Sequence, residues 1–219
     1  MRRKADIERI LSQIHGQYRP FFKVHSRVSS KRHVAVIEPS RYEEFLEVLS
    51  KDPAVPQNIK ILFFLIVSAG LRITEALSLR RSSFEIEDGE LYFYNKVLKK
   101  RDVIERKSIV HPAVASQVKE HLLKFRQFDK IFSIDRHQAL YQIKKAFGEA
   151  LDLHALRHSH ISYLIFEKGF SAEEVEALIS LNRDTVAFYA HKDPSQMLKE
   201  LYRSSTNRKK IPSLVKTRA

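Results

Sequence analysis

The sequence predicts an α+β fold that is mainly α-helical and carries a small three-stranded antiparallel sheet. Residues 59–69 are apolar nearly all round, which is typical of a helix buried in a core. Two short candidate strands, 84–86 and 91–94, flank an acidic turn with an Asp-Gly hairpin signal. Beyond Pro112 the apolar residues recur mainly at helical spacing. Together these patterns favour helices around a core, with a hairpin-based sheet beside it.

The other elements follow in chain order. A third strand is expected at 107–110, and the loop 95–106 before it is crowded with basic residues. Apolar spacing predicts a helix near residues 40–49 and a short one from about residue 74. Further helices are expected at 114–125, 138–150, 156–166, 172–181 and 194–202.

A domain boundary is expected near residue 37. The first 37 residues hold nine Lys or Arg and two Asp or Glu residues, and helical spacing is present only at their start. We therefore expect a basic N-terminal arm with one short helix over residues 1–37 and a main domain over 38–203. Residues 204–219 are expected to be a basic C-terminal tail.

Composition favours a DNA partner. A formal net charge of +13 over 219 residues attracts phosphates through counterion release, whatever the base sequence. General basicity, as in ribosomal or thermophilic proteins, explains the charge equally well. The absence of cysteine excludes disulfides, thiolate metal sites and cysteine nucleophiles. The longest apolar run, 61–70, is too short to span a bilayer and no signal core follows the first residues, so we expect a cytoplasmic protein without membrane contact.

Four short stretches supply the side chains that phosphodiester cleavage without a metal requires. In chain order they are Gly70-Leu71-Arg72-Ile73-Thr74-Glu75, Lys96, His154-Ala155-Leu156-Arg157-His158 and Tyr189-Ala190-His191. Two guanidinium groups can bind both non-bridging oxygens of a phosphate because their planar forks match its geometry. A tyrosine can be the nucleophile, and a histidine and a lysine can move the protons.

With these motifs, residues 38–203 resemble the catalytic domain of the tyrosine recombinases, the phage-integrase and Xer-type site-specific recombinases. Residues 68–79 match the family's Gly-Leu-Arg, with a carboxylate three residues later and two spaced leucines. Residues 154–158 match its His-x-x-Arg box with the common following histidine, and 185–191 match the threonine-rich approach to the nucleophile. The order and spacing of the three motifs make the resemblance specific.

The resemblance implies a role for each residue and the DNA breaking-rejoining fold. Arg72 and Arg157 would hold the scissile phosphate of double-stranded DNA while Tyr189 attacks it, giving a 3′-phosphotyrosine and a free 5′-hydroxyl. His154 would assist proton transfer, and Lys96 would protonate the departing 5′ oxygen. No metal, ATP or other cofactor is expected, because the bond energy stays in the phosphotyrosine.

Supporting roles are expected for neighbouring residues. Glu75 would orient Arg72 from one helical turn away. His158 is the histidine that commonly follows the box. Lys99, Lys100 and Arg101 would contact the DNA backbone from the loop that begins near Lys96.

Three of these positions, His154, His158 and Lys96, also suit a different role. His154 and His158 are four residues apart on a helix, which also suits zinc, although the glutamate of a His-Glu-x-x-His motif is missing. Lys96 lies among lysines that are also typical of a solvated loop. Tyr189 differs from the tyrosines in apolar helical stripes because a His-Lys-Asp-Pro break follows it.

The chain departs from the family pattern in two places. The family has Leu-Gly-His shortly before the tyrosine, where this chain has Leu178-Ile179-Ser180-Leu181-Asn182. Ser180 or Asn182 is the candidate replacement donor, and a slower enzyme is expected because one preorganised donor is worth roughly 2.7–4 kcal/mol. Most relatives also carry a helical core-binding domain in front, for which 37 residues are too few.

The main hypothesis is a site-specific recombinase or integrase that acts as a homotetramer on paired DNA sites, through a Holliday junction. Residues 194–202 would dock into a neighbouring protomer or into their own domain. One alternative is a lone cutter with the same chemistry, such as a type IB topoisomerase or a telomere resolvase. The other is a catalytically weakened DNA-binding regulator that keeps the arginines for phosphate binding.

Overall fold

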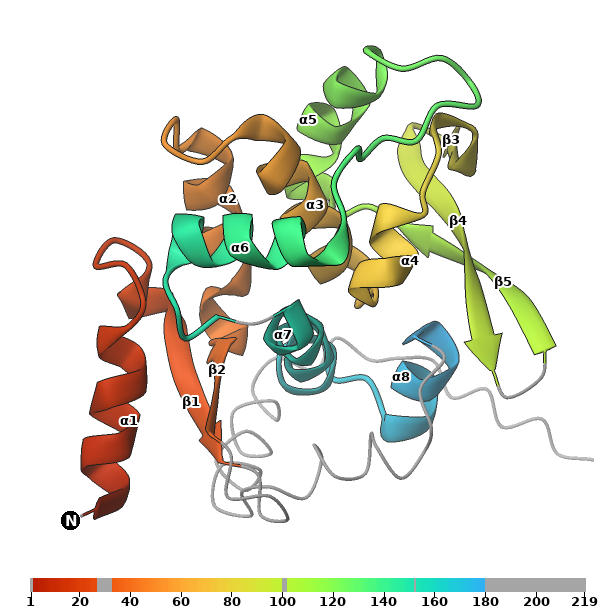
Figure 1. Ribbon diagram of the computed structural model, residues 1–219. Helices are drawn as coiled ribbons and strands as arrows, with labels where there is room; N and C mark the ends of the chain where they lie inside the picture. Colours follow the sequence, from red (N-terminus) through yellow and green to blue (C-terminus); the bar gives the residue numbers. More distant parts are fainter. Residues whose placement is uncertain (1, 27–32, 100–101, 152, 180–219) are drawn as a thin grey trace, which may run out of the picture.

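A computed structural model describes residues 2–26, 33–99, 102–151 and 153–179. Helix α3 (Gln57–Ala69) lies at its centre, in contact with α2 (Tyr42–Lys51), α5 (Pro112–Leu122), α6 (Arg136–Phe147) and α7 (Leu153–Phe166) (Figure 1). The short helices α4 (Ile73–Leu77) and α8 (Ala172–Ile179) lie near the C-terminal end of α3 and beside α7. This mainly helical arrangement with small antiparallel sheets confirms the predicted fold class.

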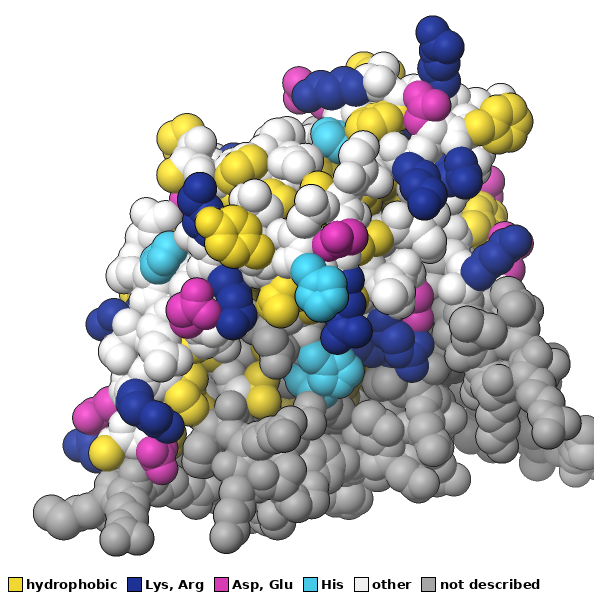
Figure 2. All heavy atoms as spheres, viewed as in Figure 1, with side chains coloured by type: hydrophobic (Ala, Val, Ile, Leu, Met, Phe, Trp, Pro, Cys, Tyr) yellow, Lys and Arg dark blue, Asp and Glu magenta, His cyan; other side chains and the backbone are white. Residues whose placement is uncertain are grey.

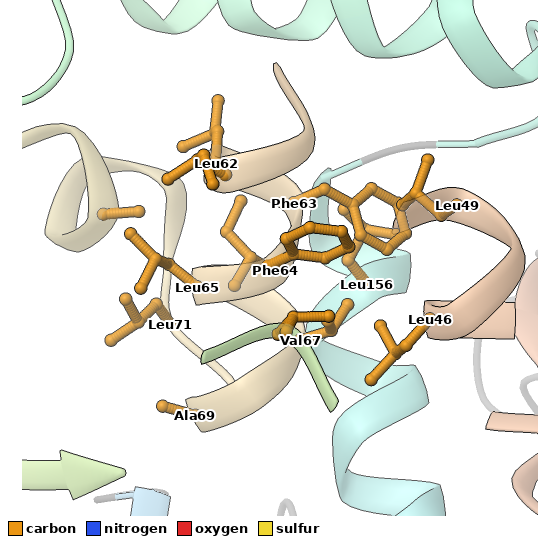
Figure 3. Packing of buried hydrophobic residues seen from close by; sticks show 14 of the residues in the cluster. Leu46, Leu49, Leu62, Phe63, Phe64, Leu65, Val67, Ala69, Leu71 and Leu156 are labelled. Carbon is orange, nitrogen blue, oxygen red and sulfur yellow. The ribbon is translucent and has the colours of Figure 1, made fainter. Parts of the chain in front are cut away.

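The core explains why α3 shows no amphipathic pattern. Its side chains from residue 59 to residue 67 are all buried, because neighbouring helices cover every face. Phe63 and Phe64 pack between α2 and α7, near Leu46, Leu49 and Leu156 (Figure 3). Fully burying each such side chain stabilises the fold by about 1.5–3 kcal/mol. The helix is thereby a fixed support for the turn at its C-terminal end.

The three-stranded sheet has the predicted antiparallel order. Its strands are β3 (Phe84–Glu87), β4 (Glu90–Lys99) and β5 (Asp102–Ile109), and Asp88-Gly89 forms the turn between the first two. The prediction of a loop over 95–106 is wrong, because β4 and β5 continue through most of it. Their register places Lys96 opposite Glu105 and Lys99 opposite Asp102, and the Lys96–Glu105 pair has opposite charges across the ladder.

The N-terminal residues contain more regular structure than a helix and a basic strap. Helix α1 (Arg2–Ser12) is followed by the antiparallel strands β1 (Phe22–Ser26) and β2 (His33–Ile37). Tyr18, Phe21 and Phe22 are buried with their rings against Phe45 of α2. Buried residues before and after residue 37 therefore belong to one core cluster. The division of the chain near residue 37 stays a prediction.

Helix boundaries differ from the expected ones by a few residues. Helix α6 begins at Arg136 because Asp135 accepts a hydrogen bond from the Gln138 backbone N–H at 2.8 Å, while the Gln138 side chain accepts one from Asp135 N–H at 3.0 Å. The helix expected at 194–202 lies outside the described residues. No helix in the described part of the chain is long and apolar enough to cross a membrane.

Candidate active site

The site begins at the turn that ends α3. Gly70 has a φ of 59°, in the left-handed region, and the Leu71 N–H donates to the Ile66 carbonyl at 3.2 Å. A Cβ at Gly70 would lie 3.0 Å from Cδ2 of His160 on α7. The backbone conformation and the close ring both require glycine here. The turn brings the next residues of the chain directly to the start of α4.

Arg72 and Glu75 form an ion pair across the first turn of α4. The Arg72 backbone N–H donates to Glu75 Oε2 at 2.8 Å, and Arg72 Nη1 donates to Oε1 at 2.7 Å. The arginine side chain is 43% exposed, whereas that of Glu75 is 8% exposed. The carboxylate therefore holds the guanidinium from its buried side and leaves part of it open to a ligand.

Arg157 reaches the same carboxylate from α7. Its side chain is 2% exposed, and its Nη1 lies 3.8 Å from Glu75 Oε2. Nη1 also donates to the Gly70 carbonyl, and Nη2 donates to the Ile179 carbonyl at 3.2 Å. Burial, together with the nearby charge of Arg72, lowers the pKa of Arg157 to about 10, so it stays charged at neutral pH. Two arginines far apart in the sequence thus meet at Glu75.

A third arginine, Arg106 of β5, lies in the same region. It is 6% exposed, its Nε donates to Asn95 Oδ1 at 3.2 Å and its Nη2 donates to the Ala69 carbonyl at 3.2 Å. Burial lowers the pKa of Arg106, Glu75 raises it, and Arg72 lowers it further. Sequence reasoning missed this residue because it was placed at the end of a loop. The strand register sets Arg106 opposite Asn95, and no local sequence pattern encodes this pairing.

Lys96, the predicted proton donor, lies on β4 and on the opposite face of the sheet from Asn95. Lys96 is exposed and faces Glu105 in the register. Because neighbouring side chains on a strand alternate between faces, Lys96 projects away from the face that carries the buried Asn95. We find no hydrogen bond that joins Lys96 to the three arginines within the described residues.

His154 and His158 lie on α7 next to Arg157. Their ring centroids are 4.5 Å apart in an edge-to-face arrangement, with His154 exposed and His158 buried. His154 precedes Arg157 by three residues and therefore shares its side of the helix. Across the described ranges, no group of three or more His, Cys, Asp or Glu side chains is arranged to hold a metal ion.

Several predicted site residues are not placed. Tyr189, Ser180, Asn182, Lys100 and Arg101 lie outside the described residues. Lys99 is the last residue of β4, opposite Asp102. The structure thus brings together the predicted Arg72, Glu75 and Arg157, with the histidine pair alongside.

Positive charge dominates the site. Arg72, Arg106 and Arg157 surround one carboxylate, Glu75, in the described part of the chain. On the face seen in Figure 2, histidine and basic side chains gather in the region where α7 and α4 lie in Figure 1. Such a surplus of guanidinium groups in a partly buried place favours binding of an anion.

A buried polar cluster of His160 and Tyr42 packs against the turn at Gly70, and the sequence analysis did not predict it. The His160 ring lies against Gly70, with its Nδ1 3.5 Å from the Tyr42 hydroxyl, which donates to the Val67 carbonyl at 2.5 Å. Burial, together with the nearby charges of Arg106 and Arg157, lowers the pKa of His160 to about 3. His160 is therefore neutral at physiological pH and serves as a packing element of the turn.

Comparison with known proteins identifies the family. Residues 35–196 match the phage integrase family. The chain belongs to this family. The predicted resemblance to the tyrosine recombinases is thereby confirmed.

Individual relatives agree with this assignment. The chain is similar to tyrosine recombinase XerC of Chlamydia muridarum (strain MoPn / Nigg), with 27% identity over 169 residues that cover 70% of this chain and 53% of the relative.

Solved structures show the same fold at low identity. The XerH site-specific recombinase in a pre-cleavage complex with its difH substrate has a TM-score of 0.58 and 20% identity, covering 78% of this chain and 52% of that one. The XerA recombinase has a TM-score of 0.57 and 15% identity, covering 79% and 66%. The Tn1549 transposon integrase in complex with transposon right end DNA has a TM-score of 0.51 and 17% identity, covering 78% and 66%. The chain thus spans about half the length of the Xer relatives XerC and XerH.

Proposed function

We propose that this chain is a site-specific DNA recombinase or integrase that cuts and rejoins DNA through a covalent 3′-phosphotyrosine. One observation carries the proposal: Glu75 contacts both Arg72 and Arg157, so that guanidinium groups from two distant motifs are fixed side by side. Two guanidinium groups held in this way can bind the two non-bridging oxygens of a phosphodiester. Membership in the phage integrase family supports the same reaction class.

In the proposed reaction, the Tyr189 hydroxyl oxygen attacks the scissile phosphorus. The tyrosine oxygen to phosphorus bond forms while the bond from phosphorus to the 5′ oxygen breaks. His154 assists transfer of the tyrosine proton, and Lys96 supplies a proton to the departing 5′ oxygen. Arg72 and Arg157 stabilise the charge on the phosphorane. Rejoining is the reverse reaction with a new 5′-hydroxyl, so it requires neither ATP nor a divalent metal.

Lys96 would have to approach the phosphate from the face of β4 opposite to Asn95. DNA lying along the hairpin of β4 and β5 would meet this exposed face, and Lys99, Lys100 and Arg101 near its tip would contact the backbone. The proposal also includes a homotetramer on paired DNA sites and docking of residues 194–202, in a neighbouring protomer or in their own domain.

Covalent trapping tests the proposed function. The full chain is incubated without metal or ATP, in the presence of a chelator, with nicked duplexes taken from the DNA that flanks its gene. Wild type is expected to give a protein–DNA band that survives denaturation, and Tyr189→Phe to give none. Tyr141→Phe is the matched control, because Tyr141 is an exposed tyrosine on α6 and should leave the band intact.

A second function has one observation in its favour. The segment 178–182 lacks the histidine of the family motif, which suits a DNA-binding regulator that retains the arginines only to hold phosphate. Tight binding to the correct site without a covalent band would support the regulator and contradict the recombinase. Covalent complexes without recombinant product would support a lone cutter of the topoisomerase or telomere-resolvase kind.

A further inference from the structure

Arg106 has a donor that its own fold does not use. Its Nη1 is buried and has no hydrogen-bond partner among the described residues, while Nε and Nη2 are bonded to Asn95 and to the Ala69 carbonyl. An unpaired donor on a buried charged group is costly, because the group has lost its water and gained no partner. Such a group in a native structure calls for an explanation, such as an ordered water, a bound ion or a functional role.

The carbonyls that bind the buried arginines connect Arg106 with the candidate site. Arg106 donates to the carbonyl of Ala69, and Arg157 donates to the carbonyl of the next residue, Gly70. Two buried guanidinium groups thus hold consecutive peptide units of the turn that leads to Arg72. Glu75 forms ion pairs with Arg72 and Arg157. Burial lowers the pKa of Arg106, and the charge of Glu75 opposes this effect.

We propose that Arg106 is a positioning residue of the phosphate site, which holds the Ala69–Gly70 turn and adds a third positive charge that a phosphate group compensates. The inference rests on the proposed function, since it takes the phosphate as the ligand of Arg72 and Arg157. Arg106 acts from a buried position, through the turn and through its charge, whereas Arg72 is open to the ligand.

The test separates the charge of Arg106 from its packing. Thermal unfolding of the full chain is followed as inorganic phosphate replaces chloride at constant ionic strength and pH. A ligand that binds only the folded state raises the midpoint with concentration, so the titration yields an apparent Kd. Arg106→Gln places an amide nitrogen where Nε lies, so it keeps a donor for Asn95 Oδ1 and removes the charge, whereas Arg106→Lys keeps the charge.

We expect Arg106→Gln to weaken phosphate binding by about tenfold or more, which corresponds to the loss of one charge-assisted interaction. Arg106→Lys should retain most of the affinity. Arg72→Gln should also weaken binding and so places the phosphate at this site. Arg80→Gln is the matched control, because Arg80 likewise donates to a carbonyl, that of Phe128 at 2.5 Å, but is exposed and does not bond to the Ala69–Gly70 turn. It should leave the Kd unchanged.

If Arg106 only stabilises the fold, a different result is expected. The midpoint in chloride would fall for Arg106→Gln, yet phosphate would bind with the wild-type Kd, and this would overturn the inference. Absence of phosphate binding by wild type, or binding that Arg72→Gln leaves unchanged, would overturn it as well.

Covalent trapping keeps the two proposals apart. Phosphate binding that depends on Arg106, without a phosphotyrosine on a tightly bound site, would leave the inference standing and contradict the recombinase. A covalent band in wild type, together with a Kd for phosphate that Arg106→Gln leaves unchanged, would support the recombinase and overturn the inference.

Discussion

The pair of contacts made by Glu75 gives a quantitative prediction. In Glu75→Gln the side chain keeps its shape and one acceptor oxygen but loses its charge. Breaking a buried ion pair by removing one partner costs about 3–5 kcal/mol, because the other charge is left uncompensated. Arg157, with a 2% exposed side chain, bears this cost, whereas the contribution of the 43% exposed Arg72 is reduced by solvent screening. The remaining amide acceptor recovers a part, so we expect a loss of about 2–4 kcal/mol.

Chemical denaturation of wild type and Glu75→Gln measures this loss, and the thermal midpoint should fall by roughly 5–15 °C for a chain of this size. The matched control is Glu44→Gln. Arg41 and Glu44 form an ion pair with the same three-residue spacing at 2.9 Å, but both side chains are substantially exposed. The control should change stability little, and high salt should remove the change. Equal losses in the two variants would refute the argument that Glu75 compensates a buried arginine.

Three further predictions concern the elements around the site. Gly70→Ala should lower the free energy of unfolding by at least about 1–2 kcal/mol, because the φ of 59° is unfavourable for alanine and the new Cβ would meet His160 at 3.0 Å. Urea unfolding measures this loss. Gly16→Ala is the control that should change stability little, because its Cβ would meet nothing within 4 Å. Gly148→Ala would place a Cβ 2.0 Å from the Gln13 carbonyl oxygen, so limited proteolysis should cut the α1 segment faster than in wild type, and an unchanged rate would contradict this contact. The unfolding free energy should fall as the pH falls from 6.5 towards 3, since the unfolded chain protonates His160 and the folded protein, with a His160 pKa of about 3, does not. The slope from this residue is at most roughly 1.4 kcal/mol per pH unit. His160→Asn should lower the slope to what the other shifted groups contribute, which are His111 and His121, whose pKa values burial also lowers, and at the acid end carboxylates such as Glu43, whose pKa the hydrogen bond from Lys168 lowers.

Local patterns predicted the parts of the site that depend on local structure. Glu75 follows Arg72 by three residues, so helical periodicity alone predicts a contact within one turn, and the two side chains meet at 2.7 Å. The approach of Arg157 to the same carboxylate joins α7 to α4, and no spacing within the sequence encodes it. Resemblance to a family indicated that pairing, and tertiary packing produces it.

Clusters of basic residues caused the main errors in predicting strands from the sequence. A loop was expected over residues 95–106, yet Lys96 and Arg106 lie in strands β4 and β5 of a hairpin, with Lys96 opposite Glu105 in the register. Strand pairing is a non-local property, and the preference of a residue for a strand depends on its cross-strand neighbours. Arg106 was missed for this reason. Strands β1 and β2 were missed in the same way, because basic residues around them suggested a strap.

Ser159 joins strand β2 to helix α7. Its hydroxyl accepts a hydrogen bond from the Ile37 backbone N–H at 2.9 Å and donates to the Ala155 carbonyl at 2.8 Å, one turn earlier on the helix that carries Arg157. A fragment that starts at residue 38 would lose this donor and would uncover the ring of Phe45. The β1–β2 hairpin and helix α7 are therefore expected to depend on each other for stability, and moving the arginine motifs into another member of the phage integrase family would require moving this hairpin with them.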